Sequence, residues 1–141
     1  MVGADTTDVA DPAEILIVDD NPDVRAMLGF ILADDFVVRY AANGGAAIEE
    51  LELRPPDIML LDVNMPGVDG YDVLEVKRQR GLAPDTHVVM LSGNDDERDL
   101  VRSWSLGAEA YLTKPIDPER VAAKLRAHLE TVAAADVTIS A

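Results

Sequence analysis

The sequence is poor in three features, and each shortage excludes a class of function. It contains no cysteine, which excludes disulfide bonds, cysteine-ligated zinc and thiol nucleophiles. Lysine and arginine total 12 against 27 acidic residues, and the net charge of -15 argues against binding to nucleic acid or to an anionic membrane. Apolar runs extend over only a few residues, so no membrane-spanning helix is predicted. Because the chain also starts without the basic and then apolar layout of a signal peptide, we predict a cytoplasmic protein.

The rest of the composition is that of an ordinary globular domain. The 141 residues include 48% hydrophobic and 28% charged residues, which fits one domain with a single core. Residues 1–12 are polar and acidic without hydrophobic periodicity, and this predicts a flexible lead. We expect the domain to span residues 13–133, and residues 134–141 to form a tail or the start of a linker.

Strand and helix patterns alternate along the domain. Short apolar, β-branched runs predict strands at residues 15–20, 36–41, 57–62, 87–92 and 110–114. Apolar residues at helical spacing predict helices at residues 21–35, 43–54, 71–80, 96–107 and from 118 onward. Five strand–helix repeats favour an α/β fold in which parallel strands are joined by right-handed helical crossovers.

Polar side chains stand at the ends of the predicted strands. Asp19 and Asp20 follow the first strand, Asp62 ends the third, Ser92 ends the fourth and Lys114 ends the fifth. The carboxyl ends of parallel strands share one edge of the sheet, where open α/β folds bind their ligands. We therefore expect these five residues to form one site.

Three carboxylates at one edge repel one another unless a cation neutralises them or a proton binds. Oxygen ligands of this kind favour Mg²⁺. A divalent cation, the Lys114 ammonium and the Ser92 hydroxyl around a carboxylate are the components of a phosphoryl-transfer site. Asp62 is the central carboxylate and therefore the best candidate for a covalent aspartyl phosphate.

Four segments carry a resemblance to a known family over about residues 13 to 133. They are "VDDNPDVR" at 18–25, "LLDVNMPGVDGYDVL" at 60–74, "VVMLSG" at 88–93 and "GAEAYLTKPID" at 107–117. In this order and spacing the chain resembles the receiver domain of two-component response regulators, the CheY-like family. The resemblance implies a flavodoxin-like, doubly wound (βα)5 fold with strand order 2-1-3-4-5. It also implies a bacterial signalling phosphoprotein rather than an enzyme.

The resemblance also implies a role for each site residue. Asp62 is the phosphoacceptor, which receives its phosphoryl group from a sensor histidine kinase or a histidine phosphotransfer protein. Asp20 and Asp62 ligate Mg²⁺ directly, Asp19 acts through water, and Asn64 contributes its backbone carbonyl. Lys114 holds the acceptor or its phosphate.

A switch is implied as well. The Lys114–Pro115 peptide bond is expected to be cis, as in the family. Phosphate on Asp62 attracts the Ser92 hydroxyl, and Tyr111 rotates into the space that opens. This change remodels the surface of the fourth helix, fifth strand and fifth helix, where downstream partner proteins bind.

Two other function classes, a phosphatase and a flavin-binding module, are alternatives to the receiver interpretation. A Mg²⁺-dependent phosphatase of the haloacid-dehalogenase-like family also forms an aspartyl phosphate, but it places a second Asp two residues after the nucleophile, where this chain has Asn64. A flavodoxin-like FMN-binding module needs a phosphate-binding loop after the first strand, where this chain has the acidic residues 19–23. The receiver interpretation is favoured over both.

Four residues outside the site received simpler interpretations. Trp104, the single tryptophan, lies on the apolar stripe of its helix with Leu100 and is predicted to be core. Lys77 stands where the family pattern has an apolar residue. His87 and His128 have no matching acidic or nucleophilic neighbour in sequence and are assigned no chemistry.

The output of the domain is left open between two possibilities. Residues 133–141 are too few for a DNA-binding or catalytic domain. The chain is therefore either a stand-alone receiver that acts by binding a partner, or a regulatory module from a longer multidomain protein.

Overall fold

Five parallel strands form one sheet in the computed structural model, which describes residues 12–93 and 97–128. The strand order is β2-β1-β3-β4-β5, so the prediction of a doubly wound parallel sheet is confirmed. The strands are β1 (Glu14–Val18), β2 (Val37–Ala41), β3 (Ile58–Asp62), β4 (His87–Ser92) and β5 (Ala110–Thr113). Because β1 ends at Val18, Asp19 and Asp20 lie in the loop that follows it.

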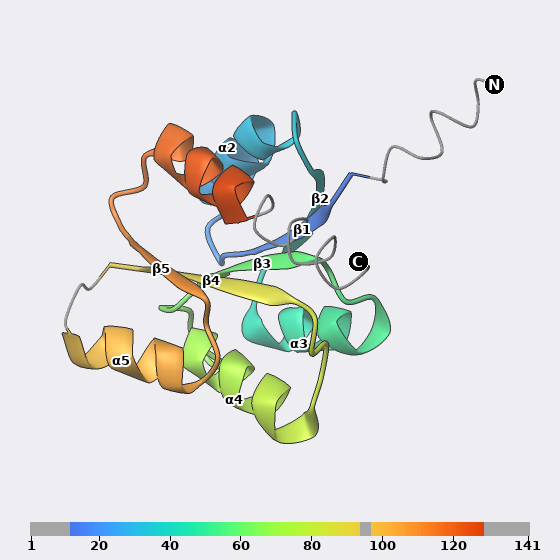
Figure 1. Cartoon of the computed structure of the whole chain (residues 1–141), viewed down its shortest axis with the longest axis vertical. Helices are drawn as coiled ribbons and strands as arrows, with labels where there is room; N and C mark the ends of the chain where they lie inside the picture. Colours follow the sequence, from blue (N-terminus) through green and yellow to red (C-terminus); the bar gives the residue numbers. More distant parts are fainter. Residues whose placement is uncertain (1–11, 94–96, 129–141) are drawn as a thin grey trace, which may run out of the picture.

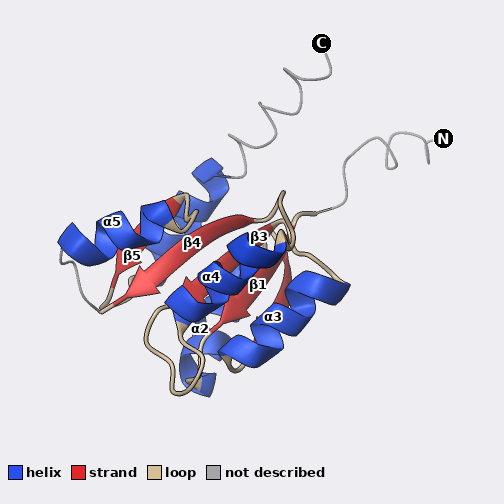
Figure 2. Cartoon of the chain, turned by 90° about the horizontal axis from the view of Figure 1, so that it is seen from below, coloured by secondary structure: helices blue, strands red, loops and turns tan. Residues whose placement is uncertain are grey.

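Helices cover both faces of this sheet. They are α2 (Pro22–Leu32), α3 (Gly44–Leu53), α4 (Gly70–Arg80), α5 (Glu97–Ser105) and a final helix that starts at residue 118 and is described to residue 128. Figure 1 shows α2 and the final helix on one face and α3, α4 and α5 on the other. Figure 2 shows α3 and α4 lying over β1 and β3. The molecule therefore has three layers.

The helix ends follow from the local sequence. The Asn21 side chain accepts hydrogen bonds from the first turn of α2, and Pro22 occupies the first helical position, where its missing N–H is not needed. Asp69 and Asp72 form a capping box at the start of α4. Gly81 ends α4 in the left-handed conformation, with φ 63°.

The core consists of two apolar layers, one on each face of the sheet. The layer under α3, α4 and α5 includes Leu16, Met59, Leu61, Val88 and Met90 with Leu51, Tyr71 and Leu74 from the helices. The layer under α2 and the final helix includes Ile15, Ile17, Leu60, Val89 and Leu91 with Leu28, Leu32, Val121 and Leu125. All five residues of β3 are buried, including Asp62 at its end. The apolar core thus fixes the position of the carboxylate that ends β3.

The prediction that Trp104 belongs to the core is wrong. Its side chain is 55% exposed, and Val101 one turn earlier is 53% exposed. Helix α5 instead turns Ser103 inward, where the residue is fully buried and its hydroxyl donates to the Asp99 carbonyl oxygen at 2.9 Å. A small hydroxyl residue that satisfies its own hydrogen bond packs closely against the sheet, and this orientation leaves the indole outside.

The predicted lead at residues 1–12 and tail at residues 134–141 lie outside the described residues, except for residue 12. Among the helices that the structure describes, none is long and apolar enough to cross a membrane.

Candidate functional site

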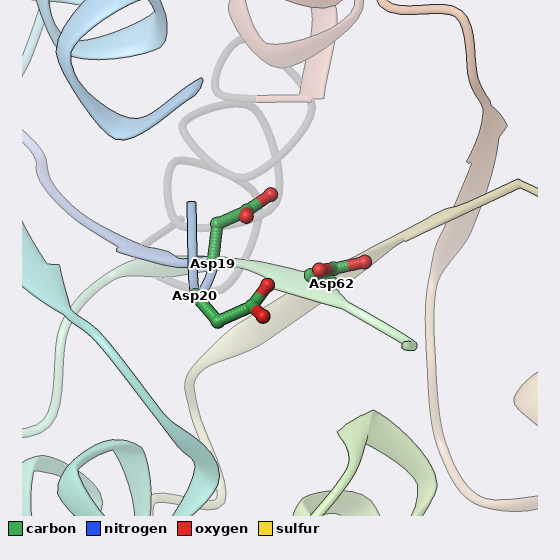
Figure 3. A group of neighbouring side chains, drawn as sticks. All are labelled: Asp19, Asp20 and Asp62. Carbon is green, nitrogen blue, oxygen red and sulfur yellow. The ribbon is translucent and has the colours of Figure 1, made fainter. Parts of the chain in front are cut away.

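Three carboxylates converge at the carboxyl edge of the sheet. Asp19 and Asp20 extend from the end of β1, and Asp62 extends from the end of the neighbouring strand β3 (Figure 3). One oxygen from each lies within 4.8 Å of the other two. The parallel pairing of β1 with β3 produces this proximity, since Val18 is in register with Leu61. Such a group of oxygen ligands could hold a metal ion.

The hydrogen bonds of the two buried carboxylates are incomplete. Asp62 is 1% exposed, and its Oδ1 accepts from the Lys114 ammonium at 3.1 Å and from the Asn64 backbone N–H at 3.3 Å. Asp19 is 2% exposed, and its Oδ1 accepts from the Asn21 backbone N–H at 2.9 Å. Among the described residues, neither Oδ2 atom has a hydrogen-bond partner. An unpaired buried carboxylate oxygen is costly, and both of these belong to the cluster of three acids.

The electrostatics of Asp62 reflect this crowding. Burial raises the pKa of the Asp62 carboxyl above its usual value of 3.8, and the negative charge of Asp19 raises it further. The hydrogen bond and charge of Lys114, and the hydrogen bond from Asn64, act in the opposite direction on that pKa. The carboxylate is therefore held at a site where its negative charge is only partly compensated.

The other predicted site residues lie at or near the same edge. Ser92 is buried at the end of β4, and its carbonyl oxygen accepts from the Lys114 backbone N–H at 2.7 Å. The Lys114–Pro115 peptide bond is cis. Tyr111 is half-buried on β5, in register with Met90 of β4, and so lies farther from the edge than Lys114.

Gly70 is a site residue whose importance the sequence did not reveal. It opens α4 and donates a backbone hydrogen bond to the Val63 carbonyl oxygen at 3.0 Å. A Cβ atom at this position would lie 2.6 Å from the Asp62 carbonyl oxygen and 2.8 Å from the Val63 Cα. In the sequence Gly70 appears only as one of several turn residues after β3. The structure shows that the missing side chain allows α4 to start directly against the Asp62 backbone.

The two histidines form a contact that their positions in sequence did not predict. His87 opens β4, and His128 lies on the final helix, with 3.1 Å between His87 Nδ1 and His128 Nε2. The rings are edge to face, with centroids 4.8 Å apart. Burial lowers the pKa of the His128 imidazole, the nearby His87 and Lys124 lower it further, and Glu109 raises it. The pair joins β4 to the final helix at the amino end of the strand, away from the three carboxylates.

This pair predicts a loss of stability in mild acid. Since the folded-state pKa of His128 lies below its usual value of 6.5, the fold favours the neutral ring. The stabilisation that comes from the neutral His128 ring is complete above pH 6.5, and it is lost as the pH falls through the folded-state pKa. Urea unfolding followed by circular dichroism between pH 7.5 and 5.5 should therefore show a steeper loss of unfolding free energy for the wild type than for His128→Gln. Equal pH dependence of the two proteins would contradict this role, because the contribution of Asp62 is common to both.

The fold and its acidic edge define a doubly wound α/β domain with a candidate cation site. The chain belongs to the response regulator receiver domain family, whose model matches residues 15–126. The chain is therefore related to the receiver domains of two-component response regulators, and the comparison gives no support to the phosphatase and flavin interpretations.

Individual relatives support this assignment. The chain is 38% identical over 112 residues to the nitrate/nitrite response regulator protein NarL of Escherichia coli. The aligned region covers 77% of this chain and 51% of NarL. It is 32% identical over 119 residues to the phosphate regulon transcriptional regulatory protein PhoB of Klebsiella pneumoniae, covering 84% of this chain and 52% of PhoB. The chain thus spans about half the length of these curated relatives.

Solved structures show the same fold. The chemotaxis protein CheY4 of Vibrio cholerae superposes with a TM-score of 0.76 at 28% identity, covering 82% of this chain and 98% of CheY4. A CheY-like receiver domain protein of Methanospirillum hungatei gives a TM-score of 0.78 at 27% identity, covering 86% of this chain and 97% of that one.

Proposed function

We propose that Asp62 accepts a phosphoryl group from a phosphohistidine of a sensor histidine kinase or a histidine phosphotransfer protein. An Asp62 oxygen attacks phosphorus, the phosphorus–nitrogen bond to imidazole breaks, and the leaving imidazole takes up a proton. The observation that carries this proposal is the buried Asp62 carboxylate, with Lys114 Nζ at 3.1 Å from Oδ1 and no partner for Oδ2 among the described residues.

The donor set around Asp62 fits Mg²⁺. Asp20, Asp62 and the backbone carbonyl of Asn64 would ligate the ion, and Asp19 would act through water. The buried Oδ2 atoms of Asp19 and Asp62, which have no hydrogen-bond partner among the described residues, support this assignment. When bound, the ion neutralises the carboxylates and the charge on the phosphoryl oxygens. Lys114 supplies a further positive charge beside the acceptor oxygen and keeps it oriented.

Phosphorylation would alter the surface on which a partner binds. A phosphoryl group on Asp62 adds acceptor oxygens near the end of β4, where Ser92 is buried. The Ser92 hydroxyl would move toward the phosphate, and Tyr111 would rotate inward on β5. The surface of α5, β5 and the final helix would then bind a downstream protein. We assign the chain a signalling role with no substrate turnover beyond gain and loss of its own phosphate.

The signalling output depends on whether the receiver domain acts on an effector domain of the same protein or on a separate partner protein. Because the chain spans about half the length of NarL and PhoB, an effector domain in the same protein is one proposed output and a separate partner protein is the other. Direct contact of this domain with nucleic acid or membrane is not proposed, because its net charge of -15 opposes both. A cytoplasmic location remains a prediction.

Phosphate incorporation tests the proposed function. The protein incubated with acetyl phosphate and Mg²⁺ should gain one phosphate, stable in acid and released by hydroxylamine, as an acyl phosphate is. Chelation of Mg²⁺ with EDTA should reduce the labelling rate by more than about tenfold, since positioning and charge neutralisation dominate phosphoryl transfer. A label that resists hydroxylamine, or labelling that is equally fast in EDTA, would contradict the proposal.

A further inference from the structure

A groove lined by apolar and cationic residues lies between the last turns of α4 and α5. Its volume is about 320 Å³, and its lining includes Leu82, Pro84, Trp104 and Leu106 together with Lys77 and Arg78. The two helices contact each other through Tyr71 of α4, whose hydroxyl donates to the Asp99 carbonyl oxygen at 3.4 Å and whose ring lies under Arg102, and the groove is lined by residues at the other end of α4. Pro84 lies in the connection to the amino end of β4, so the groove is directed toward the edge of the sheet opposite Asp62.

Two residues of this groove depart from expectation: Trp104 was predicted to be core, and Lys77 replaces the apolar residue of the family pattern. The Trp104 ring is 55% exposed although tryptophan is the largest apolar side chain in the sequence. Lys77 stands on α4 where the family pattern has an apolar residue, and it extends the same lining. An exposed indole beside half-buried leucines is an unfavourable surface in water and a favourable one under a partner.

The charge of the groove differs from that of the molecule. The chain carries a net charge of -15, yet every charged side chain in the lining, Lys77 and Arg78, is cationic. Arg80 on the same helix is paired with Glu52, whereas neither Lys77 nor Arg78 forms an ion pair with any residue that the structure describes. The groove therefore offers two uncompensated positive charges next to an apolar surface.

We propose that this groove docks an acidic, amphipathic segment of a partner protein. Apolar side chains of the segment cover Trp104 and fill the space against Leu82 and Leu106, and its carboxylates pair with Lys77 and Arg78. The choice of an acidic segment rests on the local charge of the lining, where Lys77 and Arg78 are the charged residues, and a second copy of this chain is an outcome that the test below distinguishes. The site lies outside the phosphoacceptor machinery, and it shares only α5 with the partner surface proposed above.

Fluorescence of the single tryptophan reports directly on the groove. The probe is a short synthetic peptide of glutamate and leucine, with a peptide of glutamine and leucine as its control. Titration with the acidic peptide should shift Trp104 emission to shorter wavelength in a saturable way, and the control peptide should bind at least tenfold more weakly. The acidic peptide should also bind more weakly in 0.5 M salt, where surface charges are screened.

Variants separate the groove from general charge attraction. Lys77→Gln with Arg78→Gln should weaken binding of the acidic peptide by about tenfold, as the loss of two exposed charge pairs allows. Arg120→Gln with Lys124→Gln removes two exposed charges from the final helix and should change binding less than twofold. Trp104→Ala, followed by anisotropy of a labelled peptide, should lose at least tenfold. These side chains are exposed or partly exposed, so the variants should keep the far-ultraviolet circular dichroism of the wild type.

Three results would overturn the proposal. The first is binding of the glutamine peptide as tight as that of the acidic peptide. The second is equal weakening of acidic-peptide binding by the Lys77→Gln, Arg78→Gln variant and by the Arg120→Gln, Lys124→Gln variant. The third is a Trp104 emission shift that follows protein concentration without peptide, which would place a second copy in the groove. Phosphate labelling of the Lys77→Gln, Arg78→Gln variant should equal that of the wild type. Failure of the groove proposal is thereby distinguishable from failure of the phosphoacceptor proposal.

Discussion

Substitution of Asp62 by Asn should reduce phosphate incorporation from acetyl phosphate by about two orders of magnitude or more, to the background of the assay. The amide keeps the shape of the side chain but is not a nucleophile toward phosphorus. It also removes one of the three carboxylates that lie within 4.8 Å of one another. Radiolabelling, or intact-mass measurement at acid pH, gives the stoichiometry directly.

Asp85→Asn is the matched control for this substitution. Asp85 is exposed in the connection between α4 and β4, so its loss of charge should leave labelling within about twofold of the wild type. If Asp62→Asn labels as well as the wild type does, the acceptor assignment is wrong. If Asp85→Asn is equally impaired, net charge rather than a specific carboxylate controls the reaction.

The same Asp62 variant should be more stable than the wild type in metal-free buffer at pH 7. Burial and the charge of Asp19 raise the folded-state pKa of Asp62, so the fold favours the protonated carboxyl. The stabilisation of the fold by this protonated form is lost as the pH rises through the folded-state pKa. A neutral amide avoids this loss, and the gain should be about 1 kcal/mol because the Lys114 contact is weakened at the same time. Urea unfolding measures the difference.

Substitution of Gly70 by Ala should destabilise the fold by about 2 to 3 kcal/mol, the upper part of the range for overpacking a closely packed position. The new Cβ would lie 2.6 Å from the Asp62 carbonyl oxygen and 2.8 Å from the Val63 Cα, and both are backbone atoms that cannot rotate away. Ala is the better helix former by about 1 kcal/mol, which is too little to offset this clash. Because the start of α4 must shift against Asp62, the labelling rate should fall as well.

Gly93→Ala is the control for backbone crowding. A Cβ at Gly93 meets no atom of the described residues within 4 Å, and Gly93 does not have a positive φ. Its unfolding free energy should therefore stay within about 0.5 kcal/mol of the wild type. Equal stability of the Gly70 and Gly93 variants in urea unfolding would show that α4 does not depend on the close approach to Asp62.

Much of the site was predictable because strand direction alone brings it together. Once the strands are parallel, residues at the carboxyl end of each strand must share an edge. Strand order alone therefore groups Asp19, Asp20, Asp62, Ser92 and Lys114. The apolar run from Ile58 to Leu61 predicted a buried strand, and the buried position of Asp62 followed from it. These features depend on element order, which the hydrophobic pattern encodes.

Helix rotation was less predictable than helix position. The stripe of α5 contains Leu100, Val101 and Trp104, and hydrophobicity favours turning the largest side chain inward. The sheet instead accepts Ser103, whose hydroxyl is satisfied within its own helix, so Trp104 points out beside Lys77. Close packing selects for shape as well as for apolar character, and shape complementarity between distant elements cannot be read from periodicity.

The sequence by itself determined the parallel α/β fold, the edge that carries the acidic cluster and the residues that form it, because these follow from local pattern and strand order. Only the tertiary structure decided the contacts that depend on distance between remote elements. These include the 3.1 Å contact of Lys114 with Asp62, the approach of Gly70 to the Asp62 backbone, and the pairing of His87 with His128. Each depends on how a helix or loop is placed on the sheet, and that placement is set by the packing of the whole core rather than by any single segment.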